Sequence, residues 1–380
     1  MLEELPPDRP EYRALKEART RWAKLADAGG WPSIAPGPPL KKGAKGVRVR
    51  ALRQRLAATG DLAQGDDDRF DGTVESAVRH VQERFGRAPD GVVGEPERLE
   101  LNVSAERRLR QIELNMERWR WLPASFGERY LLVNIPEYML HLVEGGRNVL
   151  DMRVVVGKAM NQTPVFSDTM TQVVVNPTWS VPQSIVTNEI VPALAEDPDY
   201  LAKHRMRLVG ENGEEVDPSD VDLGDTTAET HVLVRQDAGE DNALGSLKFV
   251  LPNSFDIYLH DTPAGALFSL EERSFSHGCI RVAEPLVLAH AVLAGRAEAD
   301  TSRLRRLIDD GTTRTIDLPK PLPVHIVYFT AIADKGDEVA FREDVYGIDQ
   351  DLVDRLRGRA RVQAAAREKA EKLAGQRRRN

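Results

Sequence analysis

Apolar side chains recur every three or four residues over the first part of the chain, which is the period of an amphipathic helix. Residues 1 to about 30 are predicted to be helical on this basis, and Gly29 and Gly30 end the pattern. Closely spaced Pro and Gly residues between 32 and 39 indicate a linker without regular hydrogen bonding. We therefore expect residues 1–40 to form a helical scaffold segment and a linker. The apolar positions of the helix are Tyr12, Leu15, Ala18, Trp22 and Leu25.

Residues 41–103 show the helical period in two shorter stretches, which an acidic turn separates. The turn contains Asp71 and Gly72. A longer helix is predicted over residues 104–122, and Pro123 ends it. The apolar positions of these three helices are, in order, Val47, Leu52 and Leu56, then Val74, Ala77, Val78, Val81 and Phe85, then Leu109, Ile112, Met116 and Trp119.

From residue 130 the period changes from about 3.6 to about 2, which is typical of strands. These stretches are rich in β-branched and aromatic residues, and turn signals such as Gly145-Gly146 separate them. This part of the chain is therefore predicted to be mostly β. The predicted strands are Tyr130–Ile135, Tyr138–Val143, Val149–Val156, Thr171–Val175, Phe255–His260, Arg314–Leu318 and Val324–Phe329.

Residues 183–246 interrupt the β pattern. A helical stretch, Ile185–Leu208, precedes an acidic, Gly-rich loop. An insertion of this length between strands is more often a lid or a binding loop than an idle connection. The predicted fold class is therefore α+β and multidomain, with a small helical domain over 41–103 and a mostly β domain over 104–350 that carries an inserted helical lid.

Residues 351–380 form a basic tail. From Arg355 to Asn380, ten Lys or Arg residues against two Glu residues give a local charge of +8. We interpret this tail as a solvated helix or a disordered segment, and contact with a polyanion or a membrane surface stays open.

Composition and charge exclude several classes of function. The 60 acidic and 52 basic residues of this 380-residue chain give a net charge of −8, which argues against a general nucleic-acid binder. Its single cysteine, Cys279, excludes an intramolecular disulfide and a multi-cysteine metal site. No uninterrupted apolar stretch of about 18 residues predicts a membrane-spanning helix, and the start lacks the features of a secretory signal. The chain is therefore either cytosolic or a mature or trimmed form.

The densest chemical cluster is Ser276-His277-Gly278-Cys279-Ile280-Arg281. A cysteine becomes a nucleophile as a thiolate, and cationic or imidazole neighbours favour that form. His277 and Arg281 flank Cys279 by two residues on each side, so we expect a thiolate here. A second imidazole, His260, ends a predicted strand and is a candidate general base. The alternatives for these residues are an inert buried thiol and satisfied core histidines.

The residues from Asn242 to Val282 resemble the L,D-transpeptidase catalytic domain of the YkuD type. More narrowly, they resemble the long murein transpeptidases of the YcbB kind. The resemblance covers about 40 residues in order and keeps the family's spacing between His260 and Cys279. It extends more weakly to residues 176–182 and 344–347. The matching residues are Asn242-Ala243-Leu244-Gly245, Lys248-Phe249, Pro252-Asn253, Ile257 to Pro263, Leu267-Phe268, Arg273 and Ser276 to Val282.

Residues 41–103 resemble the small three-helix peptidoglycan-binding domain. The alternative for this segment is a helical packing module that binds nothing, because fold alone does not establish function. The residues that carry this resemblance are Val49 to Leu56, Phe70-Asp71, Ala77-Val78, Gln82, Phe85 and Asp90-Gly91-Val92-Val93-Gly94.

The resemblance implies Cys279 as nucleophile and His260 as its base. Backbone N–H groups around Gly278 and Cys279 would stabilise the oxyanion. The implied reaction forms a 3→3 cross-link between peptidoglycan stem peptides through a thioester, with release of D-alanine and without a cofactor or metal. The implied location is the periplasm or cell envelope, and carbapenem-type β-lactams are expected to acylate the same sulfur. The implied residues that shape the site or bind substrate are Ser276, His277, Gly278, Arg281, Tyr258, Trp179 and Asn242.

Other outcomes stay open at this stage. Water, a free D-amino acid, a protein amine or a first-position acceptor could release the same thioester, which would give carboxypeptidase, exchange, anchoring or 1→3 cross-linking activity. The chain could instead be a non-catalytic peptidoglycan-binding scaffold. A zinc site of His260, His277 and Cys279 is a further reading that ligand spacing disfavours.

Overall fold

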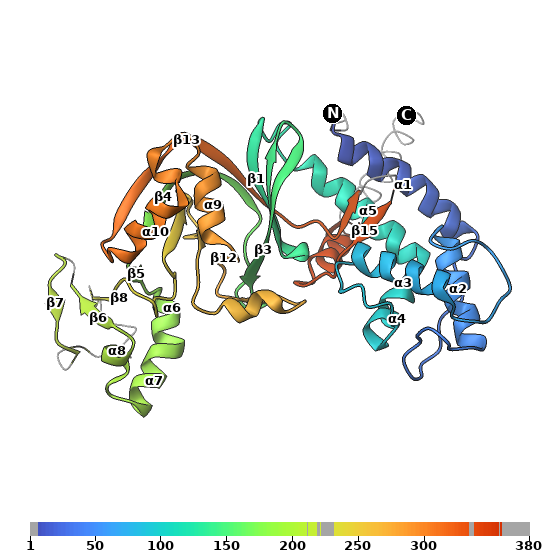
Figure 1. Cartoon of the computed structure of the whole chain (residues 1–380), viewed down its shortest axis with the longest axis horizontal. Coiled ribbons are helices and arrows are strands. Elements are labelled where there is room, and N and C mark those ends of the chain that lie inside the picture. Colours follow the sequence, from blue (N-terminus) through green and yellow to red (C-terminus); the bar gives the residue numbers. More distant parts are fainter. Residues whose placement is uncertain are drawn as a thin grey trace, which may run out of the picture. The chain divides into compact units, whose positions relative to one another are not determined.

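The structure is a computed structural model that describes residues 7–210, 212–218, 221, 232–333, 338–356 and 358. The chain divides into two compact units (Figure 1). Unit 1 contains residues 1–125 and 328–380, and unit 2 contains residues 126–327. Residues 104–125 and 328–350, which the sequence pattern groups with the β domain, thus belong to unit 1. Apart from residues 351–356 and 358, the basic tail lies outside the described residues.

Unit 1 begins with five helices. The predicted apolar face of the first helix is confirmed, because Tyr12, Leu15, Ala18 and Trp22 are buried. In the second helix Val47 is 77% exposed, so its predicted place in the core is wrong, and Val49 is buried instead. The helices are α1 (Pro10–Asp27), α2 (Val47–Ala58), α3 (Gly72–Arg84), α4 (Glu95–Leu101) and α5 (Ala105–Arg120).

Two side chains of the segment that resembles a peptidoglycan-binding domain, Asp71 and Gln82, have structural roles. The Asp71 carboxylate caps α3, because it accepts hydrogen bonds from the backbone N–H groups of Thr73 (2.9 Å) and Val74 (3.0 Å). The Gln82 amide holds the turn after α3, since it donates to Asp90 Oδ1 (2.7 Å) and accepts from the N–H of Gly91 (2.8 Å). Gly91 has a φ of 77°, which favours glycine. These motif residues therefore build the fold of the helical segment.

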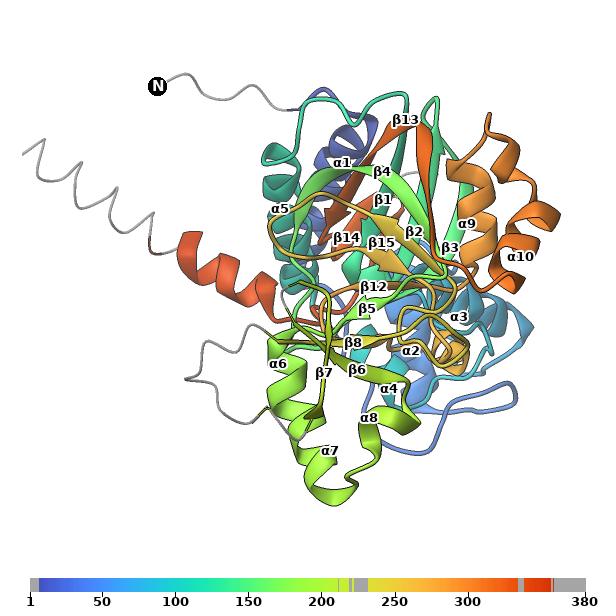
Figure 2. The same ribbon diagram turned by 90° about the vertical axis from the view of Figure 1, so that its left-hand side faces the viewer.

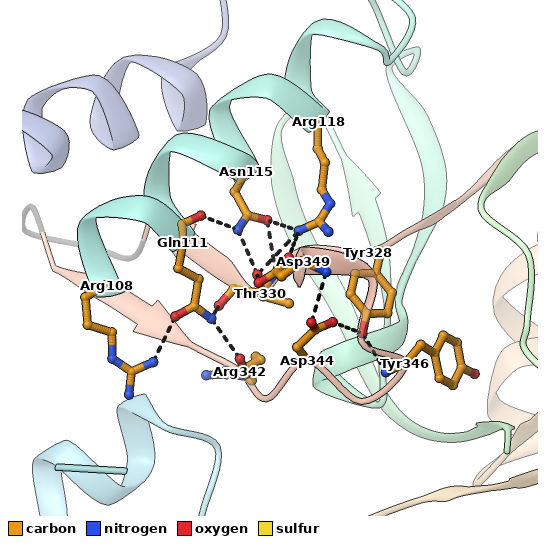
Figure 3. A network of polar contacts seen from close by, with 10 residues as sticks. All are labelled: Arg108, Gln111, Asn115, Arg118, Tyr328, Thr330, Arg342, Asp344, Tyr346 and Asp349. Atoms are coloured by element: carbon orange, nitrogen blue, oxygen red, sulfur yellow. Dashed lines mark hydrogen bonds and ion pairs between the residues drawn. The ribbon is translucent and has the colours of Figure 1, made fainter. Parts of the chain in front are cut away.

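Polar side chains of α5 bind the segment after Val327 (Figure 3). Gln111 donates to the carbonyl of Thr330 (2.8 Å), and Asn115 exchanges hydrogen bonds with the Thr330 backbone and hydroxyl. Arg118 forms a buried ion pair with Asp349 at 2.5 Å. The same segment supplies the two-stranded sheet of unit 1, which consists of β14 (Ala331–Ala333) and β15 (Val339–Phe341).

Unit 2 is built on one mostly antiparallel sheet in the order β11-β3-β12-β10-β9-β4-β13-β1-β2. Strand β2 also pairs with β3, so the hydrogen-bonded strands form a closed circuit. Their buried residues are mainly Val, Leu and Ile, as the period-2 pattern predicts. The strands are β1 (Arg129–Asn134), β2 (Met139–Glu144), β3 (Arg147–Gly157), β4 (Phe166–Val175), β9 (Leu247–Val250), β10 (Leu259–His260), β11 (Ser274–Ser276), β12 (Ile280–Val282) and β13 (Arg314–Val327).

Two strand predictions need correction. The strand expected over Phe255–His260 is only β10, because the Asn253 side chain accepts hydrogen bonds from the N–H groups of Phe255 and Ile257 and so holds a turn. Asp256 in this turn has a φ of 54°. The two strands expected over residues 314–329 are one continuous strand, β13, with a register shift in its middle.

The insertion is only partly helical. Besides α6 (Gln183–Ile185), a π-helical turn (Val186–Ile190), α7 (Val191–Glu196) and α8 (Tyr200–Lys203), it contributes strands to a four-stranded sheet (Figure 2). The predicted helix to Leu208 is therefore wrong at its end, where β6 begins. The helices and the sheet share a core that includes Ile185, Ile190 and Val234. The strands of this sheet are β5 (Trp179–Ser180), β6 (Met206–Val209), β7 (Glu215–Val216) and β8 (Leu233–Gln236).

The remaining helices of unit 2 follow β12 and lead to β13. They are α9 (Pro285–Val292) and α10 (Thr301–Asp309), whose faces toward the core carry Leu288, Val292 and Leu304. Among the residues that the structure describes, no helix of either unit combines the length and the apolar character that a bilayer crossing requires.

Candidate active site

The pairing of β10 with β12 brings the chemical residues together. The two strands are parallel, with Leu259 opposite Ile280 and His260 opposite Arg281. The backbone N–H of Ile280 also bonds the carbonyl of Tyr258 at 3.1 Å. Because directly opposed residues of paired strands point to the same face, His260 and Arg281 share one face of the sheet, and Cys279 lies in the bend directly before β12. The positive charge of Arg281 acts on both His260 and Cys279, so the imidazole and the thiol both lie near this guanidinium.

The thiol of Cys279 is half-buried and lies against the turn before β10. Its Sγ donates to the backbone carbonyl of Asp256 at 3.6 Å. The side chain of Tyr258 interacts with Cys279 and also with Trp179 of β5. Burial and the Cys279 sulfur together raise the pKa of the Tyr258 hydroxyl, so this group stays protonated and can act as a hydrogen-bond donor.

The resting thiol is not the thiolate that the sequence pattern predicts. Burial raises the pKa of Cys279, and interactions with Tyr258 and the charges of Lys248 and Arg281 offset this only in part. The expectation of a thiolate was wrong because neighbours in the sequence set the charge pattern, whereas the tertiary fold sets the desolvation of the sulfur.

His260 is 4% exposed and is held as a neutral imidazole. Burial, followed by the positive charge of Arg281, lowers its pKa to about 3. Its Nδ1 lies 2.5 Å from the backbone carbonyl of Asp261. Since a carbonyl can only accept, Nδ1 carries the hydrogen and Nε2 is left as an acceptor. This is the tautomer that a general base requires.

The loop before β12 is fixed by Ser276 and Gly278. The buried Ser276 hydroxyl donates to the carbonyl of Cys279 (2.5 Å) and accepts from the N–H of Gly278 (3.1 Å). Gly278 has a φ of 120°, and a Cβ there would lie 3.2 Å from Ile257. Its carbonyl accepts from the hydroxyl of Thr163 (2.7 Å). Ser276 and Gly278 thus shape the loop that presents Cys279.

His277 points to the insertion instead of toward the sulfur. Its Nε2 lies 2.6 Å from Glu189 of the π-helical turn. Trp179, which precedes the insertion and packs against its core, interacts with Tyr258 beside Cys279 and so makes a second connection. The structure therefore gives His277 a bridging role.

Asn242 is not part of this cluster. It is 1% exposed, its amide donates to the carbonyls of Pro177 and Asp237, and its oxygen accepts from the N–H of Leu244. Asn242 therefore holds a turn, and these bonds occupy the polar atoms that substrate binding would need.

The sequence pattern assigned no role to three residues of the site. Thr163 and Asp256 contribute through the backbone contacts of the Cys279 loop, and Lys248 lies opposite His260 in β9. No local pattern marks Thr163 or Asp256. Lys248 lies in the part of the sequence that resembles the family. Only the pairing of β9 with β10 shows that it is a neighbour of His260. Within the described part of the chain, no group of three or more His, Cys, Asp or Glu residues is arranged to hold a metal ion.

A neutral imidazole and a half-buried thiol, both near Arg281, form a candidate cysteine–histidine site. The comparisons identify the family that carries it. The model of the L,D-transpeptidase catalytic domain, YkuD, matches residues 128–317, and a model described provisionally as a peptidoglycan binding domain matches residues 45–96. The chain belongs to the YkuD-type L,D-transpeptidase family.

A curated relative agrees with this assignment. A protein of Haemophilus influenzae, for which L,D-transpeptidase is a provisional name, is 34% identical over 242 residues. The match covers 64% of this chain and 48% of the relative, so the chain spans about half the length of that protein.

Solved structures of L,D-transpeptidases also align. One from Stackebrandtia nassauensis is 12% identical over 78% of this chain and 96% of its own, with a TM-score of 0.28. L,D-transpeptidase 3 from Mycobacterium tuberculosis, in complex with a faropenem-derived adduct, is 14% identical over 52% of this chain and 60% of its own, with a TM-score of 0.26. At these TM-scores neither structure supports a conclusion about this chain.

Proposed function

We propose that this chain cross-links peptidoglycan stem peptides by 3→3 transpeptidation, with Cys279 as nucleophile and His260 as general base. One observation supports the proposal: β10 pairs with β12 so that a neutral imidazole, whose Nε2 is an acceptor, lies opposite Arg281, and the charge of Arg281 acts on both His260 and Cys279. Membership of the L,D-transpeptidase family supplies the reaction class.

The chemistry follows from these two groups. Sγ of Cys279 attacks the carbonyl carbon of the third residue of a tetrapeptide stem, and Nε2 of His260 takes the thiol proton. The proton passes to the amine of the departing D-alanine as the C–N bond breaks, which leaves a thioester. A side-chain amine of a second stem then attacks the thioester, the C–S bond breaks, and the thiol regains a proton.

The oxyanion of each tetrahedral intermediate needs a hydrogen-bond donor. The N–H of Gly278 already donates to Ser276, so we assign this role to the N–H of Cys279. The Tyr258 hydroxyl beside the sulfur is a second proposed donor. Trp179 and the Glu189 to His277 contact make the insertion the proposed lid that keeps water from the thioester.

The test uses disaccharide-tetrapeptides and mass spectrometry. The protein should form a covalent adduct that has lost D-alanine, and then cross-linked dimers. Cys279→Ala should form neither product, and dimers formed by that variant would exclude the assignment. His260→Ala should slow acylation by at least about 100-fold near neutral pH, since general bases contribute about 10²–10⁴. An unchanged rate would show that another group removes the proton.

Product analysis also separates the other acceptors. Released tripeptide indicates that water is the acceptor, and a new terminal residue indicates a D-amino acid. A 1→3 dimer indicates a first-position acceptor, and a linked protein indicates a protein amine. A chain that neither reacts with stems nor becomes acylated by a carbapenem would instead be a non-catalytic scaffold. Residues 45–96 are the proposed contact with peptidoglycan, which implies a location in the periplasm or cell envelope.

A further inference from the structure

Two cations lie on either side of His260 in the sheet. Lys248 of β9 is the register partner of His260, and Arg281 of β12 is its partner on the other side. Directly opposed residues in neighbouring strands point to the same face. The order across this face of three adjacent strands is therefore Lys248, His260, Arg281.

Neither cation forms an ion pair among the residues that the structure describes. The Nζ of Lys248 lies 3.9 Å from the centre of the Tyr258 ring, whose hydroxyl interacts with Cys279. The Nε of Arg281 is buried and has no hydrogen-bond partner. Both side chains are half-buried, and burial lowers the pKa of each. Placing two such charges in a sheet without a carboxylate partner is unfavourable unless an anion forms beside them.

The sulfur of Cys279 is the group that can become this anion. The positive charges of Lys248 and Arg281 both lower the pKa of Cys279 and both lower the pKa of His260. They favour a charged sulfur and disfavour a charged imidazole. Of the other titratable groups near the thiol, Tyr258 is held protonated, His277 is engaged with Glu189, and Asp256 carries the nearby negative charge that affects Lys248.

We propose that Lys248 and Arg281 are positioning residues that stabilise the thiolate of Cys279 and keep the resting imidazole of His260 neutral. This proposal deepens the proposed function, because it rests on Cys279 as the nucleophile. In the first step the S–H bond breaks, the proton moves to Nε2 of His260, and the positive charges of Lys248 and Arg281 stabilise the negative charge left on sulfur. The positive charges of Lys248 and Arg281 disfavour a protonated imidazole, so they favour transfer of the proton from His260 to the leaving amine.

The experiment measures alkylation of Cys279 by iodoacetamide as a function of pH. This reagent is uncharged, reacts with the thiolate, releases iodide and needs no peptidoglycan substrate. An opposite charge within about 4–6 Å shifts a pKa by about 1–3 units. Lys248→Met should therefore move the midpoint of the profile to higher pH by about one unit and slow alkylation about tenfold at a pH below the midpoint.

Three further variants make the result decisive. Lys248→Arg keeps the charge and should keep the wild-type midpoint, whereas Arg281→Gln should shift it in the same direction as Lys248→Met. Lys320→Met removes an exposed lysine of β13 and should leave the profile unchanged. If Lys248→Met does not fold by circular dichroism, Arg281→Gln provides the test.

Two outcomes would overturn the proposal: a wild-type midpoint in Lys248→Met and Arg281→Gln, or an equal shift in Lys320→Met. The alkylation profile does not depend on transpeptidation. A protein that shows these shifts but forms no cross-links would therefore contradict only the proposed function.

Discussion

The neutral state of His260 leads to a quantitative prediction. Its pKa of about 3 in the folded protein lies about 3.5 units below the ordinary value of 6.5. At about 1.4 kcal/mol per unit, the fold favours the neutral imidazole by about 5 kcal/mol. The unfolded chain binds this proton below pH 6.5 and the folded chain does not. The contribution of His260 to stability is therefore complete above pH 6.5 and is lost as the pH falls toward 3. At pH 5 the loss is about 2 kcal/mol.

The assay compares wild type with His260→Asn, whose side chain does not titrate. In ¹³C-histidine NMR spectra, the His260 ring signal, assigned by its absence in the variant, should not shift between pH 8 and pH 5. In urea unfolding, the stability difference between the two proteins should change by about 2 kcal/mol in favour of the variant when the pH falls from 7 to 5. A His260 signal that titrates with a midpoint near 6.5 would refute the reasoning, as would a stability difference that is independent of pH.

Two further variants test other parts of the molecule. Gly278→Ala places a Cβ against Ile257 on a residue with a φ of 120°. This variant should lower the free energy of unfolding by about 1–3 kcal/mol and slow carbapenem acylation at least tenfold. Acylation at the wild-type rate would show that the loop adapts freely. Arg118→Met leaves Asp349, whose pKa burial already raises, without its buried partner, so urea unfolding of unit 1 should show a loss of about 3–5 kcal/mol. Adding Asp349→Leu should restore most of that stability, and a double variant as unstable as Arg118→Met would contradict the ion-pair explanation.

Local patterns were enough to predict much of the fold. In α1 and in β1 to β4, one face of each element is buried against its neighbours. The apolar residues of that face recur in the sequence with the period of the helix or the strand, so the pattern was readable. The strand prediction failed where a side chain takes the backbone hydrogen bonds that a neighbouring strand would otherwise make, as Asn253 does before β10. The helix prediction also failed at the end of the helix expected to Leu208, because the helical part of the insertion ends at Lys203 and β6 begins at Met206.

The site was predictable in its residues but not in its electrostatics. Cys279 and His260 stand out because the signature and its spacing are present in the sequence. The burial that makes both groups neutral arises from long-range packing, which no local pattern contains. Lys248 lies 12 residues before His260 and 31 before Cys279, and only the pairing of three strands makes it their neighbour.

The division of unit 1 between the two ends of the chain has a consequence for folding. Residues 126–327 form unit 2, and in the sequence they separate α5 from its partners Thr330 and Asp349. During synthesis, which runs from the N-terminus, α5 leaves the ribosome long before these partners exist. Its buried polar side chains must remain in water until the chain has been made as far as Asp349. The unit that is begun first is therefore finished last, and loss of the residues after Val327 would remove the partners of α5 and leave the core of unit 1 open.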